Sequence, residues 1–274
     1  MTIPILDDTD FFQLFYERST EGLSKALSIT EPQVMELSVQ DKDNDRTVTV
    51  HIFKGMPEEP HIFYIPAEFD TSADLQFLAE GFQQYGYTFA VMDCRGASSF
   101  QDFFNLAQKT FEIFQEWKQQ DSRIGNTIVM GRSLGTAAAL DLATVVQKKL
   151  LCLILESAFH TSKALLEGMN VDTSILGDVE DPFENKKKMS QIEKPVLFLH
   201  CHRDDIIPVQ DIEWLVCESR SKASQFQIAG ANSRQTLAVD ADAVYFQTIN
   251  NFINLRLGRR PKRKSWRERS QHRI

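Results

Sequence analysis

The sequence lacks the features that mark a membrane-spanning or exported protein. In its 274 residues, no apolar run reaches the ~18 residues that a helix needs to cross a bilayer. The first residues, MTIPILDDTDFF, hold no basic segment ahead of an apolar one, so no signal peptide is expected. The four cysteines form no CxxC pair and lie mostly in apolar segments, which is typical of reduced thiols in a cytoplasmic protein.

Repeats, low-complexity linkers and the glycine pattern of a dinucleotide-binding fold are also absent, so we expect no nucleotide cofactor. The chain is 42% hydrophobic and 25% charged, which is ordinary for a globular protein with a sizeable core. Although the length would allow two domains, α/β folds of this size are commonly one. We therefore expect a single domain over residues 1–255.

Charge is unevenly distributed between this expected domain and the end of the chain. Residues 256–274 hold nine Arg or Lys residues against one Glu, a net charge of +8. Because the whole chain carries −8, residues 1–255 carry −16. One interpretation is a solvated tail attracted to its own acidic domain. The alternative is a tail that binds nucleic acid or an anionic surface.

The periodicity of apolar residues predicts an α/β fold. Period-two alternation at 34–40 and 47–53 predicts an antiparallel hairpin, and helical spacing at 11–27 predicts a helix before it. Beyond the hairpin, expected strands and helices alternate: strands at 61–65, 87–93, 126–131, 150–156, 195–200 and 224–229, and helices near 73–85, 102–120, 134–146, 209–220 and 241–255. This order predicts a mostly parallel sheet of about eight strands, with helices on both faces and ligands at the carboxyl ends of the strands.

Residues 131–135 read Gly-Arg-Ser-Leu-Gly, a G-x-S-x-G pattern between an expected strand and an expected helix. This is the pattern of a nucleophile elbow, in which side chains two positions either way would collide with neighbouring backbone. Ser133 would lie at a helix N-terminus, whose free N–H groups favour a developing negative charge. The alternative interpretation is a tight turn with a capping serine.

From these residues onward the chain resembles the α/β-hydrolase superfamily. The stretch DCRGAS (93–98) resembles the D-x-R-G-x-G turn of that superfamily, and LESAF (155–159) is similar to its ESPF-type strand end. The run KPVLFLH (194–200) resembles the approach to its seventh strand, so that the likeness covers roughly residues 47–255 in order. The resemblance implies an α/β-hydrolase fold and cleavage of an ester, thioester or amide through an acyl-enzyme at Ser133.

The same resemblance assigns a triad acid. HCHRDDIIP (200–208) is similar to the H-G-x-x-D-x-I-V-P segment of the superfamily, with Cys201 in place of the glycine. It implies that Asp204 is the acid, with Asp205 as second choice. The alternative is an ordinary pair of loop aspartates.

The oxyanion hole is expected to use the N–H of Leu134 and a second donor from the loop after the strand at 61–65. Because Pro66 has no N–H, Ala67 or Glu68 must supply that donor. The loop could also be a plain turn containing proline.

The expected histidine is missing. The superfamily carries it just after the last strand, and in IAGANSRQT (228–236) that position is Asn232, whose amide cannot act as a general base. His160, after the strand end at 155–159, and His202, before Asp204, are the candidate substitute bases. The other histidines are expected to be structural or to lie in the tail: His51, His61, His200 and His272. The His and Asp residues at 200–205 match no recognised metal geometry, and we expect no metal.

Three functions therefore remain open. The first is a serine hydrolase that cleaves a small carboxylic ester or thioester, slowly or atypically because the triad histidine is missing. The second is a catalytically silent relative that binds an acyl ligand or a protein partner. The third is binding of nucleic acid or an anionic surface by the basic tail. Residues 157–193 correspond to the place where the superfamily inserts a lid, which would be a small one here.

Overall fold

The computed structural model describes residues 34–41, 46–94, 97–168, 173, 181–221, 223–228 and 237–259. The predicted helix at 11–27 and the tip of the predicted hairpin lie outside these residues, as does the tail beyond Arg259. Within the described ranges, no helix is long and apolar enough to cross a membrane.

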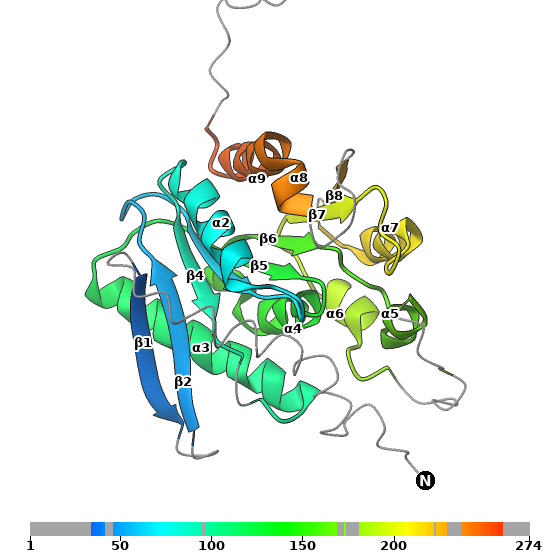
Figure 1. The fold of residues 1–274 in the computed structure, drawn as a ribbon, viewed down its shortest axis with the longest axis horizontal. Coiled ribbons are helices and arrows are strands. Elements are labelled where there is room, and N and C mark those ends of the chain that lie inside the picture. Colours follow the sequence, from blue (N-terminus) through cyan, green and yellow to red (C-terminus); the bar gives the residue numbers. More distant parts are fainter. Residues whose placement is uncertain are drawn as a thin grey trace, which may run out of the picture.

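The described strands form one sheet in the order β1-β2-β4-β3-β5-β6-β7-β8 (Figure 1). β1 pairs antiparallel with β2, and β2 pairs antiparallel with β4, whereas the remaining neighbours are parallel. The prediction of a mostly parallel sheet with an antiparallel N-terminal hairpin is confirmed. The strands are β1 Val34–Asp41, β2 Arg46–Phe53, β3 His61–Ile65, β4 Thr88–Met92, β5 Thr127–Arg132, β6 Leu150–Glu156, β7 Val196–Cys201 and β8 Ala223–Ile228.

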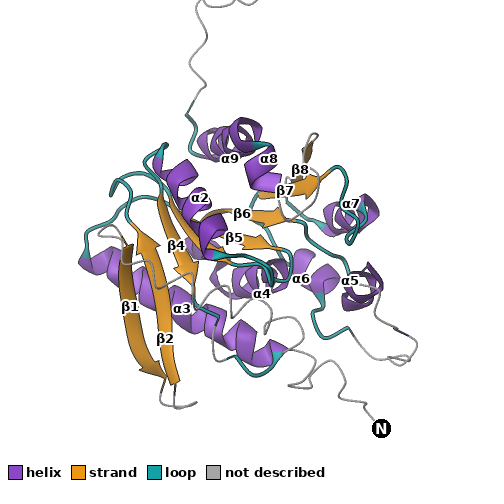
Figure 2. Cartoon of the chain, in the orientation of Figure 1, coloured by secondary structure: helices purple, strands orange, loops and turns teal. Residues whose placement is uncertain are grey.

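Helices cover both faces of this sheet, as predicted (Figures 1 and 2). α2 and α9 pack together on one face, where the Phe246 ring lies 5.8 Å from Phe77 and 5.2 Å from Phe82, between ring centroids. α3 and α4 cover the other face. The described helices are α2 Ser72–Gln83, α3 Phe100–Gln120, α4 Gly135–Val146, the 3-10 turn η2 Gln147–Lys149, α5 Ser162–Gly168, α6 Asn185–Met189, α7 Val209–Glu218, α8 Leu237–Asp240 and α9 Asp242–Arg256.

The central strands are buried along their whole length, which explains their continuous apolar sequences. Every residue of β3, β4, β5 and β7 is buried, as expected for parallel strands covered by helices on both faces. β1, at the edge of the sheet, is instead largely exposed or half-buried. Local signals also set helix starts: Thr71 and Asp74 form a reciprocal capping box at the beginning of α2.

The stretch 157–193 contributes α5 and α6 among its described residues. The end of α5 lies against the loop after β7, because a Cβ added to Gly168 would lie 1.8 Å from the carbonyl oxygen of Ile206. The stretch thus contacts the loop that carries Asp204. Its role as a lid stays a prediction.

The beginning of the basic tail contacts the domain. Arg259 donates a hydrogen bond of 2.6 Å to Glu59, in the turn between β2 and β3.

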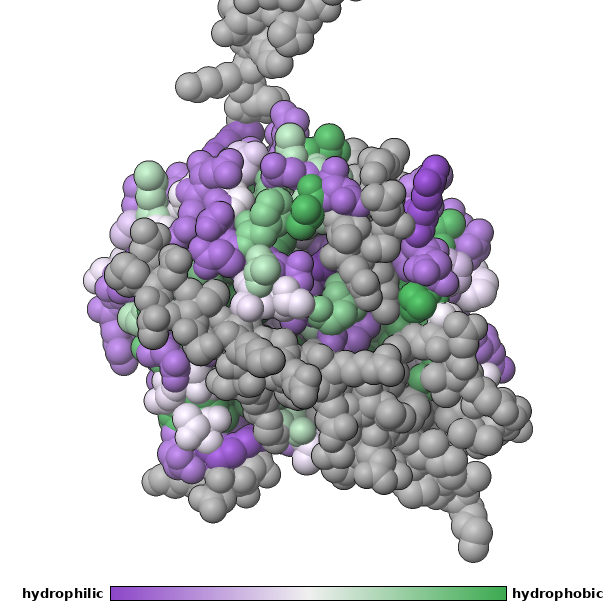
Figure 3. All heavy atoms as spheres, viewed as in Figure 1, coloured by the Kyte–Doolittle hydropathy of each residue, from purple (hydrophilic) through white to green (hydrophobic). Residues whose placement is uncertain are grey.

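On the face shown in Figure 3, the described residues are mostly hydrophilic, with small hydrophobic areas between them.

A buried lysine in α3 makes a pH-dependent contribution to stability. The ammonium group of Lys118 donates to the carbonyl of Gly125 at 2.8 Å and to the hydroxyl of Thr127 at 2.6 Å. Its side chain is almost inaccessible, and burial lowers the pKa of Lys118 to about 8. From pH 8 to about 10.5 the unfolded chain therefore holds a proton at this lysine that the folded chain has lost.

We expect the free energy of unfolding of the wild type to rise by roughly 2 kcal/mol over that window, and the rise to vanish in Lys118→Met. Below pH 8 both states are protonated and the contribution is constant. Urea unfolding at pH 7.5 and pH 10 measures the difference, with the same change at the exposed Lys148 as the control. An equal rise in Lys118→Met would contradict the assignment.

Candidate active site

Ser133 lies in a strained turn between β5 and α4. Its φ angle is 49°, in the left-handed region that non-glycine residues rarely adopt. A Cβ added to Gly131 would lie 2.5 Å from the carbonyl oxygen of Gly135, and one added to Gly135 would lie 2.3 Å from that of Ile65. Neither position can hold a larger residue without displacing backbone. Ser133 thus has the backbone geometry of an elbow, and its side chain is fully buried.

The Ser133 hydroxyl contacts a carboxylate that the G-x-S-x-G pattern does not indicate. Ser133 Oγ donates a hydrogen bond of 2.9 Å to Oε1 of Glu68, which lies in the loop after β3. The Leu134 N–H donates to the other oxygen, Oε2, at 3.2 Å. One carboxylate therefore joins the expected nucleophile to the expected first donor of the oxyanion hole. The sequence suggested Glu68 only as a source of a backbone N–H.

The second expected donor is also bonded to a carboxylate. The Ala67 N–H donates to Oδ2 of Asp70 at 2.8 Å, and the Tyr64 hydroxyl donates to the same oxygen at 2.6 Å. All three residues are fully buried. Asp70 thus holds the loop between β3 and α2 in a fixed turn around Glu68, and the Ala67 N–H is engaged within that turn.

A buried guanidinium anchors this loop to the elbow. Arg132, the residue before Ser133, lies 2.7 Å from Asp70 Oδ1 and 2.9 Å from Glu156 Oε1 at the end of β6. The hydroxyl of Tyr245 in α9 donates to Glu156 at 2.5 Å. Burial raises the pKa of both the Asp70 and the Glu156 carboxyl, and the Arg132 guanidinium opposes that rise. The cluster joins the β3 loop, the elbow, β6 and α9.

Asp204, the expected acid, is held in the loop after β7. Its side chain is fully buried, and its Oδ1 accepts the N–H groups of Ile206 at 3.1 Å and Ile207 at 2.9 Å. Its other oxygen lies 3.9 Å from Nδ1 of His200. Burial lowers the pKa of His200, and the Asp204 carboxylate opposes that shift. Asp205, the second choice, is exposed.

The two candidate substitute bases have other surroundings. The His160 ring packs against Trp214 of α7 at 4.9 Å between ring centroids. It lines a hollow of about 200 Å³ with Lys186, Trp214, Cys217 and Glu218. His202 is exposed in the turn after β7. Among the contacts of the described residues, none joins either histidine to Ser133.

Part of the expected site lies outside the described residues. Asn232 falls within 229–236, and the Arg-Gly pair at 95–96 of the D-x-R-G turn is likewise not described. Over the part of the chain that the structure describes, no three His, Cys, Asp or Glu side chains group as a metal site. Cys94, Cys152 and Cys201 are buried and Cys217 is exposed, and no disulfide joins any of them among the described residues.

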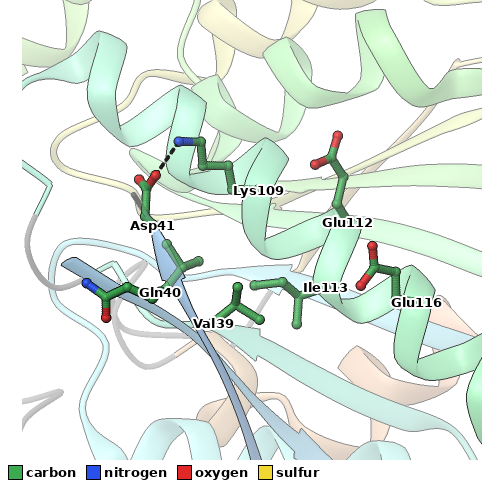
Figure 4. Close-up of a pocket in the computed structure, with 8 residues that line it drawn as sticks. Val39, Gln40, Asp41, Lys109, Glu112, Ile113 and Glu116 are labelled. Carbon is green, nitrogen blue, oxygen red and sulfur yellow. Dashed lines mark hydrogen bonds and ion pairs between the residues drawn. The ribbon is translucent and has the colours of Figure 1, made fainter. Parts of the chain in front are cut away.

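A larger hollow, of about 300 Å³, lies between the hairpin and α3. Figure 4 shows Val39 of β1 facing Ile113 of α3, with the ion pair of Lys109 and Asp41 at 2.6 Å beside them. No residue that lines it comes from the loops after β3, β5 or β7. It is therefore separate from the Ser133 site.

Solved structures share this architecture. The chain is similar to the esterase domain of a Rhodothermus marinus protein, with 15% identity, a TM-score of 0.59, and coverage of 80% of this chain and 97% of that one. For esterase Est22 the identity is 11%, the TM-score 0.62 and the coverage 90% and 85%. MGS-MChE2 is an α/β-hydrolase enzyme from the metagenome of lagoon sediments at Mar Chica, Morocco. Its identity to this chain is 14% and the TM-score is 0.57, and the match covers 80% of this chain and 99% of that one. These likenesses show that the chain has the α/β-hydrolase fold.

No family model matches the sequence, and no curated protein matches it.

Proposed function

We propose that the chain is a serine hydrolase that cleaves a small carboxylic ester or thioester through an acyl-enzyme at Ser133. The observation that carries the proposal is the left-handed Ser133 between two glycines that cannot accept a Cβ. Such a strained backbone persists only where the surrounding structure enforces it, and strain of this kind clusters at functional sites. A capping serine in an ordinary tight turn would need neither glycine.

The site around Ser133 supports this proposal in two further ways. The hydroxyl already donates its hydrogen to a carboxylate, and Asp204 lies buried in the loop after β7, where the resemblance expects the triad acid. Two of the structures with the same fold are esterases by their own descriptions. An ester or thioester is therefore the bond class that we propose, with the acyl group open.

The second candidate is a catalytically silent protein that binds an acyl ligand or a partner through the same site. Two contacts favour it. The N–H groups of Leu134 and Ala67, the expected oxyanion donors, are both bonded to carboxylates. An anion at that position repels the negative charge that acyl transfer develops.

Labelling with a fluorophosphonate probe, read by intact mass, separates the two candidates. We expect the wild type to gain one probe adduct and Ser133→Ala to gain none, because only an activated serine attacks the probe. Asn232→His restores the residue that the superfamily carries at the base position.

A wild type that stays unlabelled while Asn232→His is labelled would show an intact scaffold without a base. That result would favour the silent binder. Thermal unfolding of each variant establishes that an unlabelled protein is folded.

A further inference from the structure

The Glu68 carboxylate lies where a serine nucleophile needs its base. Its Oε1 is 2.9 Å from Ser133 Oγ, within the ≈ 2.6–3.2 Å over which a general base takes a proton. Because a carboxylate has no hydrogen to give, the serine is the donor, and its proton already points at Glu68. The amide of Asn232, at the position where the superfamily carries its histidine, cannot take a proton near neutral pH.

The carboxylate is also oriented, as a catalytic base must be. Glu68 is 6% exposed, and its second oxygen accepts the Leu134 N–H. On one side, Ala67 is fixed to Asp70. On the other, the ring of Phe69 lies 5.0 Å from the Arg132 guanidinium. A nucleophile, a base and a group that orients the base form the arrangement common to activated nucleophiles.

We propose that Glu68 is the general base of this site and takes the proton of Ser133, in place of a histidine. This inference rests on the proposed serine-hydrolase function and names a residue that the function by itself does not require.

The acylation step balances with these groups alone. As Ser133 Oγ bonds to the substrate carbonyl carbon, its proton passes to Glu68 Oε1 and the carbonyl π pair moves onto oxygen. The pair then returns, the bond to the leaving oxygen or sulfur breaks, and Glu68 gives its proton to that leaving atom. In deacylation, water repeats the sequence through Glu68, and the proton ends on Ser133 Oγ.

Charge moves over a short path in this step. Glu68 loses its negative charge as a negative charge appears on the substrate oxygen. The Leu134 N–H can therefore stop donating its hydrogen bond to Glu68 and donate it to the substrate oxygen. A Glu68 that kept its charge would instead face the oxyanion and repel it. Glu68 thus promotes acylation if it takes the serine proton, and it opposes acylation if it stays charged beside the oxyanion position.

The test is the rate of fluorophosphonate labelling from pH 5 to pH 9 for wild type, Ser133→Ala, Glu68→Gln and Asn232→His. Glutamine keeps the shape of Glu68 and an oxygen for the Leu134 N–H, but it cannot take a proton. We expect Glu68→Gln to be labelled at least ~100-fold more slowly throughout this pH range, because the amide cannot take the serine proton. Glu58→Gln, the same change at an exposed glutamate before β3, is expected to keep the wild-type rate and profile.

The other possible labelling results contradict either the assignment of Glu68 as the base or the proposed serine-hydrolase function. Labelling of Glu68→Gln at the wild-type rate overturns the base alone, and faster labelling identifies Glu68 as a block of the oxyanion position. Failure of wild type, Glu68→Gln and Asn232→His to label overturns the serine-hydrolase function together with its base. Far-ultraviolet circular dichroism of each variant excludes unfolding as the cause.

Discussion

Replacing Arg132 with methionine is expected to lower the free energy of unfolding by about 3–5 kcal/mol at pH 8. Arg132 is 2% exposed and lies between two carboxylates that are themselves buried, Asp70 at 2.7 Å and Glu156 at 2.9 Å. Methionine fills a similar volume but leaves both acids without a counter-charge. The loss measures uncompensated burial of charge, not the net value of the ion pairs.

The pH dependence of this loss identifies its cause. In the wild type, the Arg132 guanidinium opposes the rise in pKa that burial causes at Asp70 and Glu156. Without Arg132, both pKa values therefore rise further. The folded variant then binds protons that the unfolded chain does not, so its stability falls as the pH rises from 5 to 8. Urea unfolding across this range should show a larger deficit at pH 8 than at pH 5.

Two variants control the experiment. Arg203→Met makes the same change at an exposed arginine and is expected to cost less than 0.5 kcal/mol, a roughly neutral surface effect. Asp70→Asn combined with Arg132→Met and Glu156→Gln removes the charges together and should recover part of the loss. A deficit in Arg132→Met that does not change with pH would refute the electrostatic explanation.

Gly135→Ala is the second change with a large expected effect, about 2–3 kcal/mol of stability and most of the reactivity of Ser133. The added Cβ would lie 2.3 Å from the carbonyl oxygen of Ile65 and 2.6 Å from that of Pro66. Both atoms are backbone, so the end of β3 must move away from the elbow. That movement carries Glu68 away from Ser133 Oγ.

Urea unfolding and the rate of fluorophosphonate labelling measure the two parts of this prediction. Gly258→Ala is the control, because nothing lies within 4 Å of a Cβ added there. Gly258→Ala should lower the free energy of unfolding by roughly 1 kcal/mol, because a left-handed backbone is unfavourable for a residue with a Cβ. It should leave the rate of labelling unchanged. If Gly135→Ala kept the stability and the labelling rate of the wild type, the close packing of the β3 loop against the elbow would not be needed for either property.

Much of the fold was predictable because its signals are local. Period-two apolar runs at 34–40 and 47–53 became β1 and β2, and the helical spacing near 209–220 became α7. The βα alternation then determined a mostly parallel sheet, since consecutive parallel strands need a crossover between them.

The candidate site was predictable only in part. Ser133 and Asp204 could be proposed as nucleophile and acid from short patterns at strand ends, because parallel strands bring their carboxyl ends to one edge. The proposed role of Glu68 had no such signal. A glutamate in a loop that contains proline is ordinary, and its contact with Ser133 spans 65 residues of sequence. The same holds for Arg132, which occupies the variable position of G-x-S-x-G and finds Asp70 at a separation of 62 residues.

The order of the elements, the strained turn at Ser133 and the absence of a histidine at position 232 thus follow from the chain alone. Each depends on neighbours along the chain: apolar periodicity, glycine spacing, and the identity of one residue. By contrast, the contact between Glu68 and the serine and the anchoring of the β3 loop by Arg132 depend on how the chain folds in three dimensions. Those contacts arise because β3 and β5 are neighbours in the sheet, so the loops after them meet although they are far apart in the chain. Burial then leaves each polar group to find its partner inside the protein, since no water is there to replace it.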